Sequence, residues 1–389
     1  MPPRLLVLSA SAGAGHLRAA QAVELALREL APGAHVENHD VLQLANAAFR
    51  RLYGKAYLEL VDHAPHALGW MYDHLDRQHG APRSDRLRYL VQKLNLEPLL
   101  ALLKRGPWDA FVSTHFLPAE MIAAAKKKRR LAAPQLTVTT DFDTHRLWVN
   151  EPCERYFTAT EDGAAWLAAC GVARERITVS GIPIHPLFAQ RKARAGCLER
   201  LGLAGDRPIV VQLAGGFGVG PLEEIWKALL ALPMGLELVV VAGRNEAARR
   251  KLERIAVPAR HRTHVLGFTD QIDELFAVAD LLVSKPGGLT TSEALARGVP
   301  MAIVNPIPGQ ESRNSDFLLE NGAAIKVQHL ATLAGKVGAL LADPARLQRL
   351  RAHAKALGRP RAAYDVARTA LALAGTSGAG RPAATGATR

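Results

Sequence analysis

The stretch Ser284-Lys285-Pro286-Gly287-Gly288-Leu289-Thr290-Thr291-Ser292-Glu293 decides the fold of this 389-residue chain. It continues the run Asp280–Ser284, whose apolar residues predict a strand, and it leads into a run that predicts a helix. Two adjacent glycines at such a turn let the backbone approach a ligand closely. The free N–H groups of the following helix N-terminus suit a diphosphate. The segment therefore indicates an α/β domain with an anion-binding turn.

The start of this helix carries two polar side chains that allow competing interpretations. Thr290 can add a hydroxyl donor to the glycine turn, and Glu293 can accept hydrogen bonds from two adjacent ribose hydroxyls. The spacing Thr290-x-x-Glu293 is also that of a capping box, in which the carboxylate bonds to its own helix start. A carboxylate used in that way is poorly placed for a ribose, so both alternatives stay open.

Strands and helices alternate in both directions from this stretch. The first half has expected strands at Arg4–Ser9, His35–His39, Asp109–Ser113 and Gln135–Thr139. The second half has expected strands at Pro208–Leu213, Leu236–Ala242, His264–Gly267, Asp280–Ser284, Pro300–Asn305 and Ala323–Val327. Regular alternation predicts parallel sheets with helices on their faces, and the chain length suggests two domains. We therefore expect an α/β protein of two Rossmann-like, doubly wound parallel sheets.

Composition suggests where the domains begin and end. The segment Gly181-Ile182-Pro183-Ile184-His185-Pro186 predicts a rigid, extended hinge, because each proline fixes its own φ and restrains the residue before it. We expect a first domain over 1–182, a second over 183–358, and a C-terminal helix over 359–375 that packs back on the first domain. The Gly/Ala/Thr-rich residues 376–389 predict a disordered tail.

A second glycine turn, Gly13-Ala14-Gly15-His16, separates the first expected strand from a helix at Leu17–Leu30. Gly13 and Gly15 keep the crevice open, and His16 faces it at the helix start. A neutral imidazole can take a proton from a hydroxyl at pH 7, and a structural role at the helix start is the alternative. Arg18 replaces the third glycine of a dinucleotide fingerprint, which argues against NAD and FAD.

Two further turns offer groups that suit a phosphorylated sugar. Gly216 lies in the glycine-rich turn after Pro208–Leu213, which suits either an amide wall for phosphate or a plain flexible turn. Gln310 and Glu311 begin the helix after Pro300–Asn305, where their side chains suit sugar hydroxyls or form an ordinary polar helix start.

The segment after the strand Gln135–Thr139 carries acidic and aromatic residues. The spacing Asp141-Phe142-Asp143 can hold Mg²⁺ or Mn²⁺ through carboxylate oxygens. We expect no metal there, because no other acidic ligands cluster nearby in the sequence. Trp148, which follows Arg146 closely, suits either a membrane interface or a buried position.

The net charge of +13 favours anionic partners. Basic residues concentrate at Lys126–Arg130 and between Arg346 and Arg389, where nine Lys/Arg accompany one acid; solvated helix faces are the alternative. Aromatic residues are only 5% of the chain, which argues against a stacking platform for single-stranded nucleic acid. No run of about 18 apolar residues predicts a membrane span, and three scattered cysteines fit a reducing cytosol.

Six motifs together point to a known family. They are Gly13-x-Gly15-His16, Thr140-Asp141-Phe142, Gly181-Ile182-Pro183, Ala242-Gly243-Arg244-Asn245, Lys285-Pro286-Gly287-Gly288 and Pro308-Gly309-Gln310-Glu311. In their order and spacing, over residues 4–345, the chain resembles the processive diacylglycerol glucosyltransferases and the monogalactosyldiacylglycerol synthases. These share a superfamily with the N-acetylglucosaminyltransferase that makes lipid II. Ala14 departs from the pattern, since relatives often have Gly or Asn there.

The resemblance implies the GT-B fold, in which two Rossmann-like domains face each other across a cleft. It also implies a UDP-hexose donor, inversion at the anomeric carbon, and neither a metal nor another cofactor. By position, Phe268 would frame the uracil, Glu293 the ribose, and the glycine turn the diphosphate. The full set of expected donor-binding residues is Gly15, Gly216, Arg244, Phe268, Gly287, Gly288, Thr290, Glu293, Gln310 and Glu311.

The resemblance further implies that the first domain receives a diacylglycerol-type lipid at an anionic membrane surface, with no nucleic-acid partner. His16 is the expected base, and Asp141 is its competitor or orienting partner. His145 and Trp148 are expected on the acceptor and membrane side. The protein would be cytoplasmic and peripheral on the inner face of the cell membrane. A UDP-sugar 2-epimerase, a transferase acting on another lipid, and a lipid-binding protein without activity are the alternatives.

Overall fold

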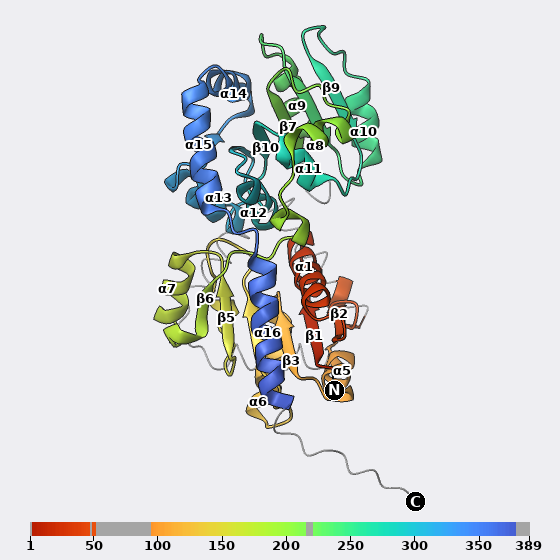
Figure 1. Ribbon diagram of the computed structural model, residues 1–389, viewed down its shortest axis with the longest axis vertical. Helices are drawn as coiled ribbons and strands as arrows, with labels where there is room; N and C mark the ends of the chain where they lie inside the picture. The colour runs from red at the N-terminus through yellow and green to blue at the C-terminus, as the bar shows by residue number, and fades with distance from the viewer. Residues whose placement is uncertain (1, 47–48, 52–94, 215–220, 379–389) are drawn as a thin grey trace, which may run out of the picture.

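The computed structural model describes residues 2–46, 49–51, 95–214 and 221–378. These residues form two α/β domains stacked along the long axis of the molecule (Figure 1). The first domain carries the N-terminus, and the second holds the green to light-blue elements. Gly216 and residues 379–389 of the expected tail lie outside the described residues.

The first domain is built on a six-stranded parallel sheet with the order β2-β1-β3-β4-β5-β6. Its strands are β1 (Arg4–Ser9), β2 (His35–Asp40), β3 (Ala110–Ser113), β4 (Gln135–Val138), β5 (Arg155–Thr158) and β6 (Ile177–Val179). Its helices are α1 (Ala14–Leu30), α5 (Glu97–Arg105), α6 (Phe116–Lys127), α7 (Glu161–Ala169) and α16 (Ala362–Gly378).

Both faces of this sheet are covered by helices, because side chains alternate between faces along each strand. Leu5 and Val7 of β1 pack with α1 and α16, which lie side by side in front of the sheet (Figure 1). Leu6 and Leu8 pack on the other face with α5 and α6. The first strand is therefore buried from Leu5 onward, as its apolar run Leu5–Leu8 predicts.

The second domain holds another six-stranded parallel sheet, with the order β12-β11-β10-β7-β8-β9. Its strands are β7 (Ile209–Leu213), β8 (Glu237–Val241), β9 (Arg262–Leu266), β10 (Leu281–Ser284), β11 (Met301–Val304) and β12 (Ala324–Val327). Its helices are α8 (Arg194–Leu201), α9 (Leu222–Leu230), α10 (Glu246–Glu253), α11 (Ile272–Val278), α12 (Gly288–Arg297), α13 (Gln310–Glu320), α14 (Leu333–Leu341) and α15 (Pro344–Leu357). The expected fold of two doubly wound parallel sheets is confirmed.

Each sheet reverses its strand order once, and the glycine turns lie at these two reversals. The order reverses between β1 and β3 in the first domain and between β7 and β10 in the second. Ligands of open α/β sheets bind at the carboxyl ends of the strands beside such a reversal. The turn Gly13–His16 follows β1, and the turn Lys285–Gly288 follows β10. Topology thus places both motifs where a ligand crevice is expected.

Two segments cross between the domains, side by side. The chain leaves the first domain through residues 180–185, which lead to the 3-10 turn Pro186–Ala189. It returns from the second domain to the first between α15 and α16. Gly181 has φ +85°, and a Cβ there would lie 2.4 Å from the Cβ of Arg359 in the returning segment. Glycine is required at this crossing for both reasons. The last helix, α16, packs on α1 of the first domain and extends to Gly378, three residues beyond the expected 375.

Candidate active site

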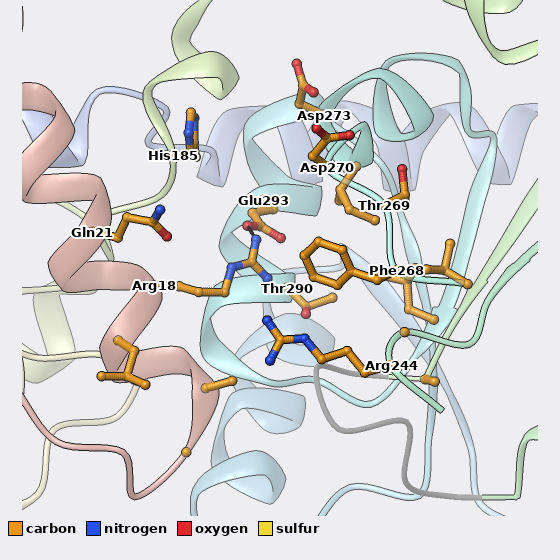
Figure 2. A pocket seen from close by; sticks show the side chains of 18 of the residues that line it. Arg18, Gln21, His185, Arg244, Phe268, Thr269, Asp270, Asp273, Thr290 and Glu293 are labelled. Carbon is orange, nitrogen blue, oxygen red and sulfur yellow. Dashed lines mark hydrogen bonds and ion pairs between the residues drawn. The ribbon is translucent and has the colours of Figure 1, made fainter. Parts of the chain in front are cut away.

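A cavity of about 1160 Å³ opens between the two domains. The first domain contributes the turn 11–14 and the α1 side chains Leu17, Arg18 and Gln21. The second domain contributes the turns after β8 and β9 and the face of α12 that carries Thr290 and Glu293. Figure 2 shows these side chains converging from α1 on one side and from α12 and the β9 turn on the other.

One wall of the cavity presents an exposed aromatic ring. Phe268 is 69% exposed, which is unusual for a large apolar side chain. The guanidinium carbon of Arg244 lies 5.3 Å from the centre of this ring. A planar cation over an aromatic face forms an amphipathic surface on which a planar base can stack. Both residues were predicted from the sequence, and the structure brings them together.

Glu293 lies on the wall opposite α1 and forms an ion pair with Arg18 of the first domain. The Glu293 side chain is 1% exposed and that of Arg18 is 45% exposed. Burial raises the pKa of Glu293 to about 7, and the charge of Arg18 opposes this rise. The Glu293 carboxylate thus accepts a hydrogen bond from the Arg18 guanidinium across the cleft between the domains.

The capping-box interpretation of Thr290 and Glu293 is wrong. Helix α12 begins at Gly288, its N-cap is Gly287, and no side chain caps it. Thr290 is thus already inside the helix, so it cannot be the N-cap residue. Both side chains lie on the face of α12 that lines the cavity.

Of the two glycines in the second-domain turn, Gly288 is required for packing in this structure. A methyl group on Gly288 would lie 2.3 Å from the Thr140 carbonyl oxygen, which belongs to the first domain. A Cβ on Gly287 would lie 3.8 Å from a carboxylate oxygen of Glu311. The start of α12 therefore packs directly on the carboxyl end of β4, and a larger residue at Gly288 would separate the domains.

Asp141 lies beside this contact and is 8% exposed. Burial raises the pKa of its carboxyl to about 7, the charges of Glu311 and Asp143 add to the rise, and a hydrogen bond with Asn314 opposes it. Burial also raises the pKa of Glu311, whose carboxylate accepts a hydrogen bond from the Ile307 backbone N–H at 2.8 Å. Two acids with raised pKa values thus lie near the carboxyl end of β4.

His16 is held by the neighbouring strands of its own domain. Its Nδ1 lies 3.1 Å from the Thr114 carbonyl oxygen and 2.8 Å from the Thr140 hydroxyl. A carbonyl oxygen only accepts, so this contact favours the tautomer with the proton on Nδ1 and the lone pair on Nε2. Burial lowers the pKa of His16 to about 4, which keeps the imidazole neutral at pH 7.

The expectation that Trp148 meets a membrane is wrong for this structure. Trp148 is 2% exposed and packs among the rings of His16, His115 and Phe116, with centroids 6.1–6.4 Å away. His145 is 1% exposed, and its Nδ1 accepts a hydrogen bond from the Leu147 backbone N–H at 3.0 Å. Both side chains therefore support the loop after β4, and the alternative of a buried tryptophan holds.

The predicted donor-binding residues divide into two groups. Those that line the cavity are Arg244, Phe268, Thr290 and Glu293. The others lie near the contact of α12 and α13 with the first domain, and they are Gly15, Gly287, Gly288, Gln310 and Glu311. Gly216 lies outside the described residues.

Two residues that join the domains at the site were not predicted from the sequence. Arg18 was noticed only as a replacement of a glycine, although its position two residues after His16 places it at the cleft end of α1. Asn314 was not singled out, yet it is fully buried and bonds to both domains. Asn314 lies four residues after Gln310, so the two side chains share one face of α13. This spacing could have identified Asn314 from the sequence.

The basic residues predicted to meet a membrane are distributed unevenly. Lys126 is 6% exposed and pairs with Glu154 at 2.6 Å, whereas the residues 127–130 at the end of α6 are exposed. The arginines beyond Arg346 spread over α15 of one domain and α16 of the other, and Arg351 pairs with Asp280. The cluster 127–130 is thus the more compact surface. Among the described residues, no helix is long and apolar enough to cross a membrane.

Both domains of the chain are similar to known glycosyltransferases. The family model for monogalactosyldiacylglycerol (MGDG) synthase matches residues 16–184, and that for glycosyl transferases group 1 matches residues 209–357. Processive diacylglycerol beta-glucosyltransferases of Bacillus mycoides and Bacillus cereus are 29% identical over 380 residues, which cover 95% of this chain and 94% of the relative.

Solved structures share the two-domain architecture. Acinetobacter baumannii MurG matches with a TM-score of 0.63 and 18% identity, covering 95% of this chain and 100% of its own. Anabaena HepE in complex with UDP and glucose matches with a TM-score of 0.54 and 15% identity, over 97% and 100%. A Listeria monocytogenes protein described as a UDP-N-acetylglucosamine 2-epimerase matches with a TM-score of 0.57 and 14% identity, over 98% of each chain. At these identities the likeness concerns the fold, and the GT-B architecture is confirmed.

The two family models lie one on each domain, and the order of the six motifs agrees with both. The full-length relatives extend over the same two domains, including the crossings at 180–185 and after α15. The chain is a glycosyltransferase that is similar to the monogalactosyldiacylglycerol synthases over its first domain and to the processive diacylglycerol glucosyltransferases over nearly its whole length.

Proposed function

We propose that the protein transfers glucose or galactose from a UDP-sugar to a diacylglycerol-type lipid, with inversion and without a metal or other cofactor. The observation that carries the proposal is the interdomain cavity, in which Phe268, Arg244, Thr290 and Glu293 converge. Full-length relatives named as diacylglycerol glucosyltransferases support the lipid acceptor, and the complex of HepE with UDP and glucose supports a UDP-sugar donor.

The cavity offers a separate group to each part of a uridine nucleotide. The uracil stacks on Phe268, and the ribose hydroxyls bond to Glu293. The diphosphate lies toward the start of α12, where Thr290 and the unpaired N–H groups of the first turn can donate. UDP leaves with the charge of two phosphates, so oriented donors at this helix end favour its departure.

The hexose then extends toward the contact of α12 and α13 with the first domain, where Gln310 and Glu311 can bond to its hydroxyls. The lipid hydroxyl attacks the anomeric carbon from the face opposite UDP, and the carbon–oxygen bond to UDP breaks. His16 Nε2 takes the hydroxyl proton, because Nδ1 is held by Thr114 and Thr140. One displacement of this kind inverts the configuration. Asp141 is the second candidate for the base, since its pKa of about 7 suits proton transfer near neutral pH.

The expected partner is an anionic membrane surface rather than nucleic acid, and the expected location is the cytoplasmic face of the cell membrane. The exposed basic residues 127–130 at the end of α6 support a membrane contact of the first domain. Each basic group near an anionic surface contributes about 1 kcal/mol to binding.

Purified protein with UDP-glucose or UDP-galactose and diacylglycerol tests the proposal, with mass spectrometry of the lipids and NMR of the new anomeric centre. We expect a hexosyl lipid with inverted configuration, formed equally well with EDTA present. Isomerised UDP-sugar in a reaction without lipid would instead support the epimerase alternative. Absence of any hexosyl lipid with either donor would contradict the transferase proposal for this acceptor.

A further inference from the structure

The ion pair between Arg18 and Glu293 joins the two domains inside the cavity. Arg18 is on α1 of the first domain, and Glu293 is 275 residues away on α12 of the second. The Glu293 carboxylate is buried, whereas the Arg18 side chain is 45% exposed and free to reach other parts of the cavity. Figure 2 shows the guanidinium of Arg18 pointing from α1 toward Glu293.

A second cation points to the same region. Figure 2 shows the guanidinium of Arg244 directed toward Thr290, on the same side of the cavity as Arg18. Among the described residues, Arg244 contacts the Phe268 ring and forms no ion pair. The acidic residues Asp270 and Asp273 lie at the other end of the cavity, and Asp273 already pairs with Lys192 at 2.8 Å. Two guanidinium groups therefore lie on this side of the cavity, one paired with Glu293 and one directed toward Thr290. Glu246 also lines the cavity but pairs with Arg249, which leaves a local excess of positive charge.

The spacing of Thr290 and Glu293 on α12 places this positive charge between the ribose and the diphosphate of a bound nucleotide. Thr290 and Glu293 are three residues apart, which is about 5 Å along a helix axis. A guanidinium at Glu293 is thus about one helical turn from the diphosphate at the helix start. A flexible arginine side chain spans that distance by rotation of its own bonds.

We propose that Arg18 exchanges Glu293 for the diphosphate of the donor when the nucleotide binds. This inference rests on the proposed function, and it makes Arg18 the contact of the first domain to the nucleotide. After the exchange every charged group still has a partner. Arg18 pairs with the diphosphate, and the Glu293 carboxylate accepts hydrogen bonds from the ribose hydroxyls in place of Arg18. A guanidinium also binds phosphate through two parallel hydrogen bonds, which suits the new contact.

Calorimetric binding of UDP and of uridine tests the exchange, because only UDP carries the diphosphate. For Arg18→Ala we expect UDP affinity to fall roughly tenfold or more, as for the loss of a hydrogen bond to a charged group. Uridine affinity should stay the same or rise, because Glu293 loses a competitor. Arg18→Lys should retain part of the UDP affinity, since an ammonium still attracts phosphate without the paired hydrogen bonds.

Arg28→Ala is the matched control. Arg28 is on the same helix, pairs with Glu24 at 2.9 Å, and does not line the cavity. Arg28→Ala should change neither the UDP affinity nor the uridine affinity. Equal losses for UDP and uridine in Arg18→Ala would overturn the exchange, and so would an unchanged UDP affinity. Failure of the proposed function has a different signature, namely that the unaltered protein binds no UDP.

Discussion

The side-chain amide of Asn314 connects the two domains beside Asp141. Its Oδ1 accepts a hydrogen bond from the Phe142 backbone N–H at 3.0 Å, and its Nδ2 donates to the Pro286 carbonyl at 3.0 Å. A further hydrogen bond with the Asp141 carboxyl lowers the pKa of that group against the effect of burial. One fully buried side chain therefore contacts the first domain, the glycine turn of the second, and a candidate base.

Asn314→Ala should destabilise the protein and shift its activity toward higher pH. The substitution leaves the buried Phe142 N–H and Pro286 carbonyl without a partner, at a cost of about 1–3 kcal/mol for each group. It also removes a bond that favours the ionised Asp141, so the Asp141 pKa rises. If activity needs this carboxylate, the acidic limb of the pH–rate profile moves upward. Denaturant unfolding and kcat/KM against pH measure the two effects.

Ser315→Ala is the control for this prediction. Ser315 is the next residue and is equally buried, and its hydroxyl has no hydrogen-bond partner among the described residues. It should lose little stability and keep the profile of the unaltered protein. Similar behaviour of both variants would show that Asn314 contributes only packing.

The strands and glycine turns could be predicted from the sequence because their patterns are local. The runs that became β1 and β7 are mostly apolar, and glycine turns follow both β1 and β10. Strands β5 and β6 were missed, because Arg155–Thr158 and Ile177–Val179 are short and partly polar. The start of β9 was placed too late, since its first residues, Arg262 and Thr263, are polar as well.

The contacts between the domains could not be predicted in the same way. Arg18 and Glu293 are 275 residues apart, and Phe142 and Asn314 are 172 residues apart. Helical spacing identifies which residues share a face, but it carries no information about which face meets the other domain. The same limit applies to Trp148, whose amphipathic ring suits both a membrane interface and a core.

UDP should stabilise the protein against heat, and Glu293→Ala should largely remove this effect. A ligand that binds only the folded state raises stability by RT ln(1 + [L]/Kd). Because Glu293 is not part of a helix cap, the loss of its carboxylate acts on the ribose and on Arg18. Glu293→Gln should keep part of the effect, since an amide still bonds to hydroxyls. Differential scanning fluorimetry with and without UDP measures the shift, and an undiminished shift in Glu293→Ala would rule out the ribose contact.

The protein should bind vesicles that contain anionic lipid, more weakly as salt rises, and should leave neutral vesicles unbound. The combined substitution of Lys127, Arg129 and Arg130 by Glu should reduce binding strongly, because these exposed residues form one cluster. Arg346 and Arg349 on α15 are exposed as well but belong to the second domain, so their substitution by Glu is the control. Co-sedimentation measures both. Equal losses in the two variants would mean that net charge alone decides binding, and the first-domain contact would be abandoned.

His16→Ala should abolish hexose transfer while UDP affinity stays nearly unchanged. The His16 ring contacts residues of the first domain, whereas most nucleotide contacts are on the second. A lost general base typically costs about 10² to 10⁴ in rate, and single-turnover transfer across pH measures it. The two candidate bases differ in the pH at which they become protonated. With His16 as base, kcat/KM should fall only as pH approaches its pKa of about 4.

With Asp141 as base, the same fall should be centred near its pKa of about 7, because protonation removes the active carboxylate. Asp141→Asn keeps the shape of the side chain and is the matched variant. If Asp141→Asn is inactive while His16→Ala retains most activity, the carboxylate is the base and our assignment is wrong. If both variants collapse alike and still bind UDP, the two groups act as a unit, because such residues do not contribute additively. In that case the pH profile decides which of them carries the proton. Because Glu293 also has a pKa of about 7, a fall centred near pH 7 assigns the proton to Asp141 only if it persists in Glu293→Gln, and a flat profile down to about pH 5 assigns it to His16.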